Sequence, residues 1–462
     1  MTTISPKCLA SALLASAGLV FTANASAEPL TLEKAIQLAQ QNDARALEKR
    51  YEAEAAAALA QEAEGAGGWL LDMTSALALT TEVDGGFFDN NCTNNCGNQN
   101  VRDDLYDPDG ITPFISIKAA LIKPLYTFGK IENYKAAAEQ LEVIKTEDVT
   151  LQHAATGMDV VKAWYGNLAA LGGIALLSEA MDRLTAAEDI AQELIDEDDN
   201  DISEGDLYTL KAGKGLIQKF LAQAEGIQKT AHAGLALLTN QDPNSMTLAS
   251  KRLRPLPLPA ASLEEMQERA LSQRPEMRQL AAGLKARRSL IKAKQAEGRP
   301  NIFAGVAGSV AWAPGRDQLD NPHIFDPFNH YAASPLVGVQ WKWQGSRTEA
   351  QVTQAEAQLR ALEAKGEFAS AGIPFQVAEA WYKVEAGYKA QRALSTASRD
   401  ARRAMLSAYL DFEAGTGEPA KALEALKTYV LTYADYLLTV NNYNNDVINL
   451  RRLSGDPLLA QP

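Results

Sequence analysis

The sequence contains few cysteines and histidines, on which many metal sites and nucleophilic catalytic sites depend. It has 3 cysteines and 4 histidines among 462 residues, and no two histidines stand at the spacing of a metal-ligand pair. Lysine and arginine are outnumbered 44 to 58 by acidic residues, for a formal net charge of -14. Because no segment concentrates positive charge into a phosphate-binding surface, a general nucleic-acid binder is excluded. We expect neither an enzyme nor a bound cofactor or metal.

The first 27 residues have the pattern of a signal peptide. Lys7 supplies a positive charge, residues 9–21 are apolar, and Ala25-Ser26-Ala27 fits a small-residue cleavage site. The apolar run is too short to span a bilayer, and no later apolar stretch of about 18 residues is evident. We therefore expect an exported protein without a membrane-spanning helix, with a net charge after cleavage of 43 minus 58, or -15.

Two cysteines remain after cleavage, Cys92 and Cys96, in a loop rich in asparagine and glycine. In an oxidising compartment a disulfide that closes this small loop is plausible, whereas a metal site without further ligands is not.

Internal repetition sets the expected domain organisation. Three landmarks recur in the same order: Thr31-Leu32-Glu33 and Ser262-Leu263-Glu264, Ala163-Trp164-Tyr165 and Ala380-Trp381-Tyr382, and Leu238-Thr239-Asn240 and Leu453-Ser454-Gly455. We predict a first repeat at 28–250, a proline-rich linker at 251–261, a second repeat at 262–456 and a short tail at 457–462. We expect the Trp-Tyr pair of each repeat to pack in the core.

Each repeat predicts one long helix flanked by two shorter helical runs. Residues 129–195 lack proline, which allows a helix of about 66 residues, roughly 100 Å long. Two runs of about half that length, 32–64 and 206–238, could lie end to end beside it. The second repeat has equivalent runs at 345–414, 263–297 and 420–453. Pro374 should kink its long helix, and Gly157 occupies the matching place in the first repeat.

Four segments alternate apolar and polar residues with the period of a half-buried strand. They lie at about 69–82, 111–126, 300–313 and 334–345, two in each repeat. In the last, Val337, Val339, Trp341 and Trp343 alternate with polar or small residues. Such a face, with Trp312 at the end of the third segment, is typical of barrel strands with an aromatic belt at the lipid surface. The alternative is an ordinary sheet packed on helices.

Several short segments, taken in order, resemble a known family. They are Leu30 to Ala35, Pro124 to Gly129, Gln273 to Met277, Gly298-Arg299-Pro300, Gln354 to Leu359, Gly415-Thr416 and Leu423-Glu424-Ala425. Each segment alone is too variable to identify a family, and it is their common order and spacing that make the resemblance specific. Over essentially the whole mature chain, the sequence resembles the TolC-like outer membrane efflux and secretion channels.

The resemblance implies a mainly α fold with a membrane β-barrel part in the outer membrane of a Gram-negative bacterium. Three copies would each give four strands to one barrel, because four strands alone cannot close one. The long helices would form an α-helical barrel that extends into the periplasm. The implied function is a passive exit duct of a tripartite efflux pump or a type I secretion system. Its implied partners are a periplasmic adaptor (membrane fusion) protein, an inner-membrane RND or ABC transporter, and outer membrane lipid.

Acidic residues crowd the turn between the helices of the first repeat, Asp198 and Asp201 among them. The spacing is not that of a Ca²⁺ loop, because Asp201 stands where glycine is required. By the resemblance, Asp206 and Glu424 would ring the periplasmic entrance and attract cations. Lys421 departs from the family, which often has an acid there. The plainer interpretation is a solvated acidic turn.

A second hypothesis, from a different class, is a soluble periplasmic coiled-coil scaffold or adaptor with a small sheet domain. The duplication and the apolar face of the fourth strand favour the duct, because a soluble scaffold gains nothing from a lipid-facing stripe.

Overall fold

The computed structural model describes residues 29–83, 110–196, 203–318, 323 and 325–459. The expected signal peptide, Cys92, Cys96, Asp198 and Asp201 lie outside the described residues. The first repeat contains α1 (Leu32–Asn42), α2 (Ala44–Gly65), β1 (Leu70–Thr81), β2 (Ile111–Tyr126), α3 (Lys130–Asp196) and α4 (Glu204–Thr239). The second contains α5 (Leu263–Gln273), α6 (Pro275–Glu297), β3 (Asn301–Trp312), β4 (His330–Gln340), α7 (Gly345–Glu413) and α8 (Pro419–Ser454).

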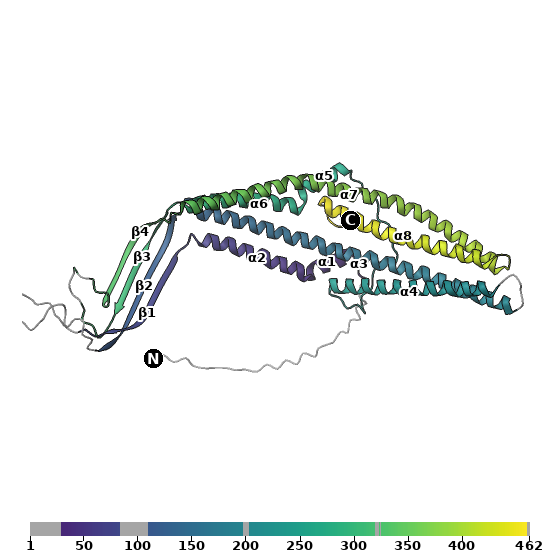
Figure 1. Cartoon of the computed structure of the whole chain (residues 1–462), viewed down its shortest axis with the longest axis horizontal. Helices are drawn as coiled ribbons and strands as arrows, with labels where there is room; N and C mark the ends of the chain where they lie inside the picture. Colours follow the sequence, from purple (N-terminus) through teal and green to yellow (C-terminus); the bar gives the residue numbers. More distant parts are fainter. Residues whose placement is uncertain (1–28, 84–109, 197–202, 319–322, 324, 460–462) are drawn as a thin grey trace, which may run out of the picture.

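The helices run along the long axis of the molecule, with the sheet at one end and the paired ends of α3 with α4 and of α7 with α8 at the other (Figure 1). As predicted, α2 and α4 lie one beyond the other along α3, and α6 and α8 do the same along α7. Contacts of α3 with α6 and α8 join the repeats side by side. The result is a helical wall in which α7 forms one edge and α2 and α4 form the other.

Two helical runs predicted as continuous are each broken after their first 11 residues. Asp43 ends α1 and caps α2, where its side chain accepts a hydrogen bond from the Arg45 backbone N–H. Arg274 separates α5 from α6 because it precedes Pro275, and a residue before proline disfavours helical geometry. Pro374, in contrast, lies inside α7, which continues unbroken for 69 residues.

Buried side chains form three clusters between the helices: one around α1, α3 and the end of α4, one near the turns, and one around α5, α7 and α8. The Trp-Tyr pairs differ between repeats. Trp164 and Tyr165 are both buried as predicted, but Tyr382 is 60% exposed because it faces outward from the edge helix α7.

Helix α3 corrects the expectation that no membrane-length apolar stretch follows the signal peptide. Within the described residues, this one helix is long and apolar enough to cross a membrane by length and composition alone. Half of the stretch is buried inside the protein, and Val160, Val161 and Leu168 of α3 are core residues. Packing between helices therefore accounts for its apolar character.

The proline-rich linker is held against the second repeat by Asn444 of α8. The Asn444 side chain accepts a hydrogen bond from the Leu256 N–H and donates one to the Arg254 carbonyl oxygen, each at 2.8 Å. Because Asn444 is fully buried, its polar atoms need these partners.

Candidate channel wall and entrance

The four strands form one antiparallel sheet in the order β1-β2-β3-β4. The register aligns their alternating patterns: Leu71 lies opposite Leu121, Leu121 opposite Val306, and Val306 opposite Pro335. Cross-strand partners project to the same side of a sheet. All four strands therefore place their apolar residues on one face.

We call this side the apolar face. Its large side chains are Leu71, Met73, Leu77, Leu79, Ile115, Ile117, Leu121, Val306, Val310, Trp312, Tyr331, Val337 and Val339. All are exposed, from 39% for Ile115 to 86% for Tyr331. Contiguous exposed apolar surface of this extent indicates contact with a membrane or another protein. The predicted alternative, a sheet packed on helices, does not describe this face.

The dimensions of the sheet fit a bilayer. Strand β1 has 12 residues and β2 has 16. At about 3.4 Å per residue β1 is about 40 Å long, and a tilt of about 45° reduces its height to about 28 Å. The apolar band of an outer membrane barrel is about 25 Å tall.

The opposite side of the sheet is polar. Asp72, Thr74, Ser116, Lys118 and Ser309 project from it, because each alternates with a residue of the apolar face. His330, at the start of β4, lies 3.0 Å from the Ser309 hydroxyl. A barrel closed with this side inward would have a hydrophilic passage.

The tryptophans predicted to form an aromatic belt do not all lie within the strands. Trp312 lies on the apolar face opposite Ile115, as expected. Trp341 and Trp343 fall beyond β4, which occupies 330–340 and not 334–345. The last pair of this ladder is Asn301 with Gln340, because the chain before Asn301 turns away at Pro300. The Trp341 indole N–H instead donates to the Gly298 carbonyl oxygen at 3.0 Å.

Three further aromatics at the ends of the apolar face were missed. Tyr331 is at the loop end, and Trp69 and Tyr126 are at the helix end, each more than half exposed. Continuing the alternation one step before Leu71 would have found Trp69. Tyr331 was missed because β4 was predicted to begin after it.

Strands β1 and β4 form the edges of the sheet, and each pairs with one neighbour among the described residues. An exposed edge presents unpaired backbone N–H and C=O groups that can bind a strand of another chain. The sheet is therefore open at both edges to a second copy.

Asp206 lies in the first turn of α4, and α4 begins at the end of the molecule away from the sheet. Its carboxylate accepts hydrogen bonds from the Ser203 hydroxyl at 2.7 Å and the Ser203 N–H at 3.1 Å, which completes a capping box. These bonds lower the pKa of the Asp206 carboxyl below its ordinary value. The carboxylate therefore stabilises the start of the helix in addition to contributing negative charge.

The two residues predicted for the other turn lie in the first turns of α8 and are exposed. Lys421 pairs with Glu418 at 2.8 Å, and Glu424 lies 3.4 Å from Lys427. Each charge is thus partly balanced within its own helix.

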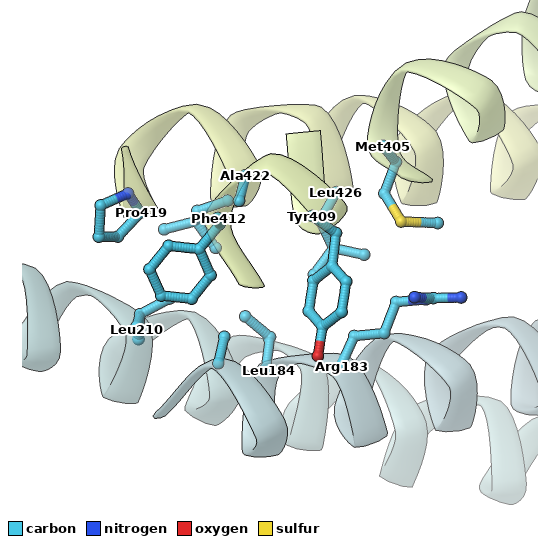
Figure 2. Close-up of a pocket in the computed structure, with 11 residues that line it drawn as sticks. Arg183, Leu184, Leu210, Met405, Tyr409, Phe412, Pro419, Ala422 and Leu426 are labelled. Atoms are coloured by element: carbon cyan, nitrogen blue, oxygen red, sulfur yellow. The ribbon is translucent and has the colours of Figure 1, made fainter. Parts of the chain in front are cut away.

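The two helical hairpins are packed tightly together close to these turns (Figure 2). Phe412 of α7 is 1% exposed and points toward Leu210 of α4, which is 2% exposed. The space left between the lining residues, including Leu184 and Met405, is only about 10 Å³. The seven-residue spacing of Met405 and Phe412 is the sequence signal that could have identified this contact.

Comparisons with known proteins agree with this architecture. Residues 267–456 match the family model described as outer membrane efflux protein. No curated protein matches the chain.

Solved structures match nearly the whole chain. A membrane protein from Pseudomonas aeruginosa is 18% identical, covers 92% of this chain and 93% of its own, and has a TM-score of 0.74. The outer membrane protein VceC from Vibrio cholerae is 16% identical, with coverages of 93% and 97% and a TM-score of 0.69. The MtrE outer membrane channel from Neisseria gonorrhoeae is 18% identical, with coverages of 92% and 89% and a TM-score of 0.68.

The exposed apolar sheet at the end of a long helical wall is the fold of the outer membrane channels. Within this class, the resemblance to the TolC-like outer membrane efflux proteins is confirmed by the match over residues 267–456 and by the fold of the whole chain.

Proposed function

We propose that this protein is a trimeric outer membrane channel and serves as the exit duct of a tripartite efflux pump or a type I secretion system. The observation that carries the proposal is the sheet, with an exposed apolar face, a polar face and two open edges. Three copies of four strands give a twelve-stranded barrel whose apolar face contacts lipid and whose polar face lines a water-filled passage.

The edges of the helical wall support closure by further copies. On α7, Phe368, Phe375 and Tyr382 recur every seven residues and are 60% to 79% exposed. On the opposite edge, Tyr51 and Leu59 of α2 are 60% and 48% exposed. Apolar stripes at helical spacing on both edges fit lateral packing of one copy on the next.

The partners proposed from the family are a periplasmic adaptor protein and an inner-membrane RND or ABC transporter. The fold and the family are those of channel proteins, so the energy for transport would come from the transporter. At the periplasmic entrance, three copies of Asp206 and Glu424 would attract cations, and Lys421 would weaken that attraction. Asp198 and Asp201 would add to the same acidic region.

Recordings from planar bilayers test the proposal. We expect the purified protein to give discrete conductance steps, and we expect Asp206→Asn with Glu424→Gln to weaken block by cations. An absence of conductance would favour the soluble scaffold. Conductance and cation block that do not change in the double variant would remove the entrance-ring role while leaving the duct intact.

A further inference from the structure

The helix end of the sheet carries two exposed cations that the channel architecture does not require. The Lys123 Nζ atom lies 5.8 Å from the centre of the Trp69 ring, and the Arg299 guanidinium lies 5.8 Å from that of Phe128. Neither cation forms an ion pair within the described part of the chain. In a chain with a net charge of -14, two unpaired cations seated on aromatic rings indicate an anion from outside the protein.

Both cations lie where the apolar face ends. Lys123 is two residues beyond Leu121 on β2 and shares its face, opposite the position of Trp69. Arg299 lies two residues before the start of β3 at Asn301, and the Phe128 ring beneath it meets the Tyr126 ring edge-on, with 4.6 Å between the ring centres. The indole of Trp341 is fixed to the neighbouring Gly298. Lys123 lies opposite Ala304, five residues along the chain from Arg299, so the cations and aromatic rings occupy successive steps over the helix end of the sheet.

If the apolar face lies in a bilayer, the helix end of the sheet lies in the headgroup region. Aromatic rings settle at the depth of the lipid headgroups, and long cationic side chains extend to the phosphates while their stems stay on apolar surface. Clustered lysine and arginine at a membrane surface attract anionic lipids. Because the helices continue from this end of the sheet, it corresponds to the periplasmic surface.

We propose that Lys123 and Arg299, seated on Trp69 and Phe128, bind the phosphates of anionic phospholipids at the periplasmic surface of the outer membrane. The acyl chains of these lipids lie along the apolar face beside Leu71 and Leu121. The proposal rests on the proposed function, because it requires this face to be in a membrane. A lipid is favoured over free phosphate because the cations adjoin an exposed apolar surface that only a lipid would also contact.

The test is retention of lipid by the full-length protein extracted in mild detergent. Native mass spectrometry and thermal melting would be recorded with added phosphatidylglycerol, phosphatidylcholine or inorganic phosphate. We expect the protein to retain phosphatidylglycerol and to melt at a higher temperature in its presence, with little effect of the other two additions. In the Lys123→Gln/Arg299→Gln double variant, affinity for phosphatidylglycerol should fall on the order of tenfold.

Two controls separate this site from other causes. Lys118→Gln removes a cation from the opposite side of β2 and should leave lipid retention unchanged. Lys123→Arg/Arg299→Lys keeps both charges and should retain the lipid. This variant shows whether lipid is lost in the Gln double variant because the charges are removed or because the protein misfolds. Equal retention by the protein and the Gln double variant would overturn the proposal, and stabilisation by inorganic phosphate alone would overturn the lipid assignment. If either result is obtained with a protein that conducts in planar bilayers, the lipid site is wrong but the proposed function is unaffected. If the unaltered protein does not conduct, the proposed function itself is contradicted.

Discussion

Arg278 in α6 and Glu147 in α3 are joined by two parallel hydrogen bonds. The Arg278 Nε donates to one Glu147 carboxylate oxygen at 2.6 Å, and Nη2 donates to the other at 2.7 Å. The Glu147 side chain is only 14% exposed. Because α3 belongs to the first repeat and α6 to the second, this pair fixes how the two halves of the wall lie side by side. Two parallel hydrogen bonds fix the orientation of the two side chains relative to each other and also pair their opposite charges.

Removing either partner should destabilise the wall. A double-mutant cycle with Arg278→Ala and Glu147→Ala should give a coupling of about 1 kcal/mol in the apparent free energy of unfolding of the extracted protein. Arg278→Lys should recover only part of it, because lysine lacks the fork of two donors. Strictly additive effects of the two alanine changes would contradict the role of this pair.

The two faces of the sheet should respond in opposite ways to a new charge. Ile117→Arg places a cation in the middle of the apolar face and should cost about 2–4 kcal/mol in a bilayer. Ser116→Arg, one residue earlier on β2, places the same side chain on the polar face. Immunoblots of outer membrane fractions should show loss of the first variant and retention of the second. Equal levels of the two would argue against the assigned faces.

Asn444 should be required for docking of the linker. Asn444→Leu leaves the Leu256 N–H and the Arg254 carbonyl without their partner and should cost about 2 kcal/mol. The matched control is Asn442→Leu, since Asn442 is exposed two residues earlier on α8. Limited proteolysis should then cleave 251–261 faster in the Asn444 variant only. Unchanged cleavage of that variant would mean that other contacts hold the linker.

The start of α4 should loosen in acid. The pKa of Asp206 is lowered in the folded protein by hydrogen bonds from Ser203, so its contribution to stability is present above the ordinary value of 3.8. It is lost as the pH falls below that value. Hydrogen exchange of the first-turn amides should accelerate there in the unaltered protein, while Asp206→Asn should show a weaker pH dependence. An identical pH profile for the two proteins would exclude Asp206 as the titrating group.

Patterns with a short period were sufficient to predict the faces of the sheet. Alternation with period two placed Val337 and Val339 on one side of the fourth segment, and the register pairs them with Ala304 and Ile302 on the apolar face. Absence of proline likewise predicted the extent of the long helix α3. These features are local, because the period of the backbone alone determines which side chains share a face.

Features that depend on partners distant in the sequence could not be predicted in this way. The end of β4 before Trp341 is set by where β3 begins, about 40 residues earlier in the chain. The burial of Phe412 against Leu210 depends on how two hairpins approach each other. Acids at a turn are equally consistent with solvation and capping, so the bonds of Asp206 to Ser203 became evident only in the structure.

The most direct test of the account is the native mass of the mature protein extracted from cell membranes, measured together with the fraction in which it is found. We predict a species of three copies in the outer membrane fraction, because one copy supplies four strands with two open edges. A monomer in the soluble periplasmic fraction would contradict the account.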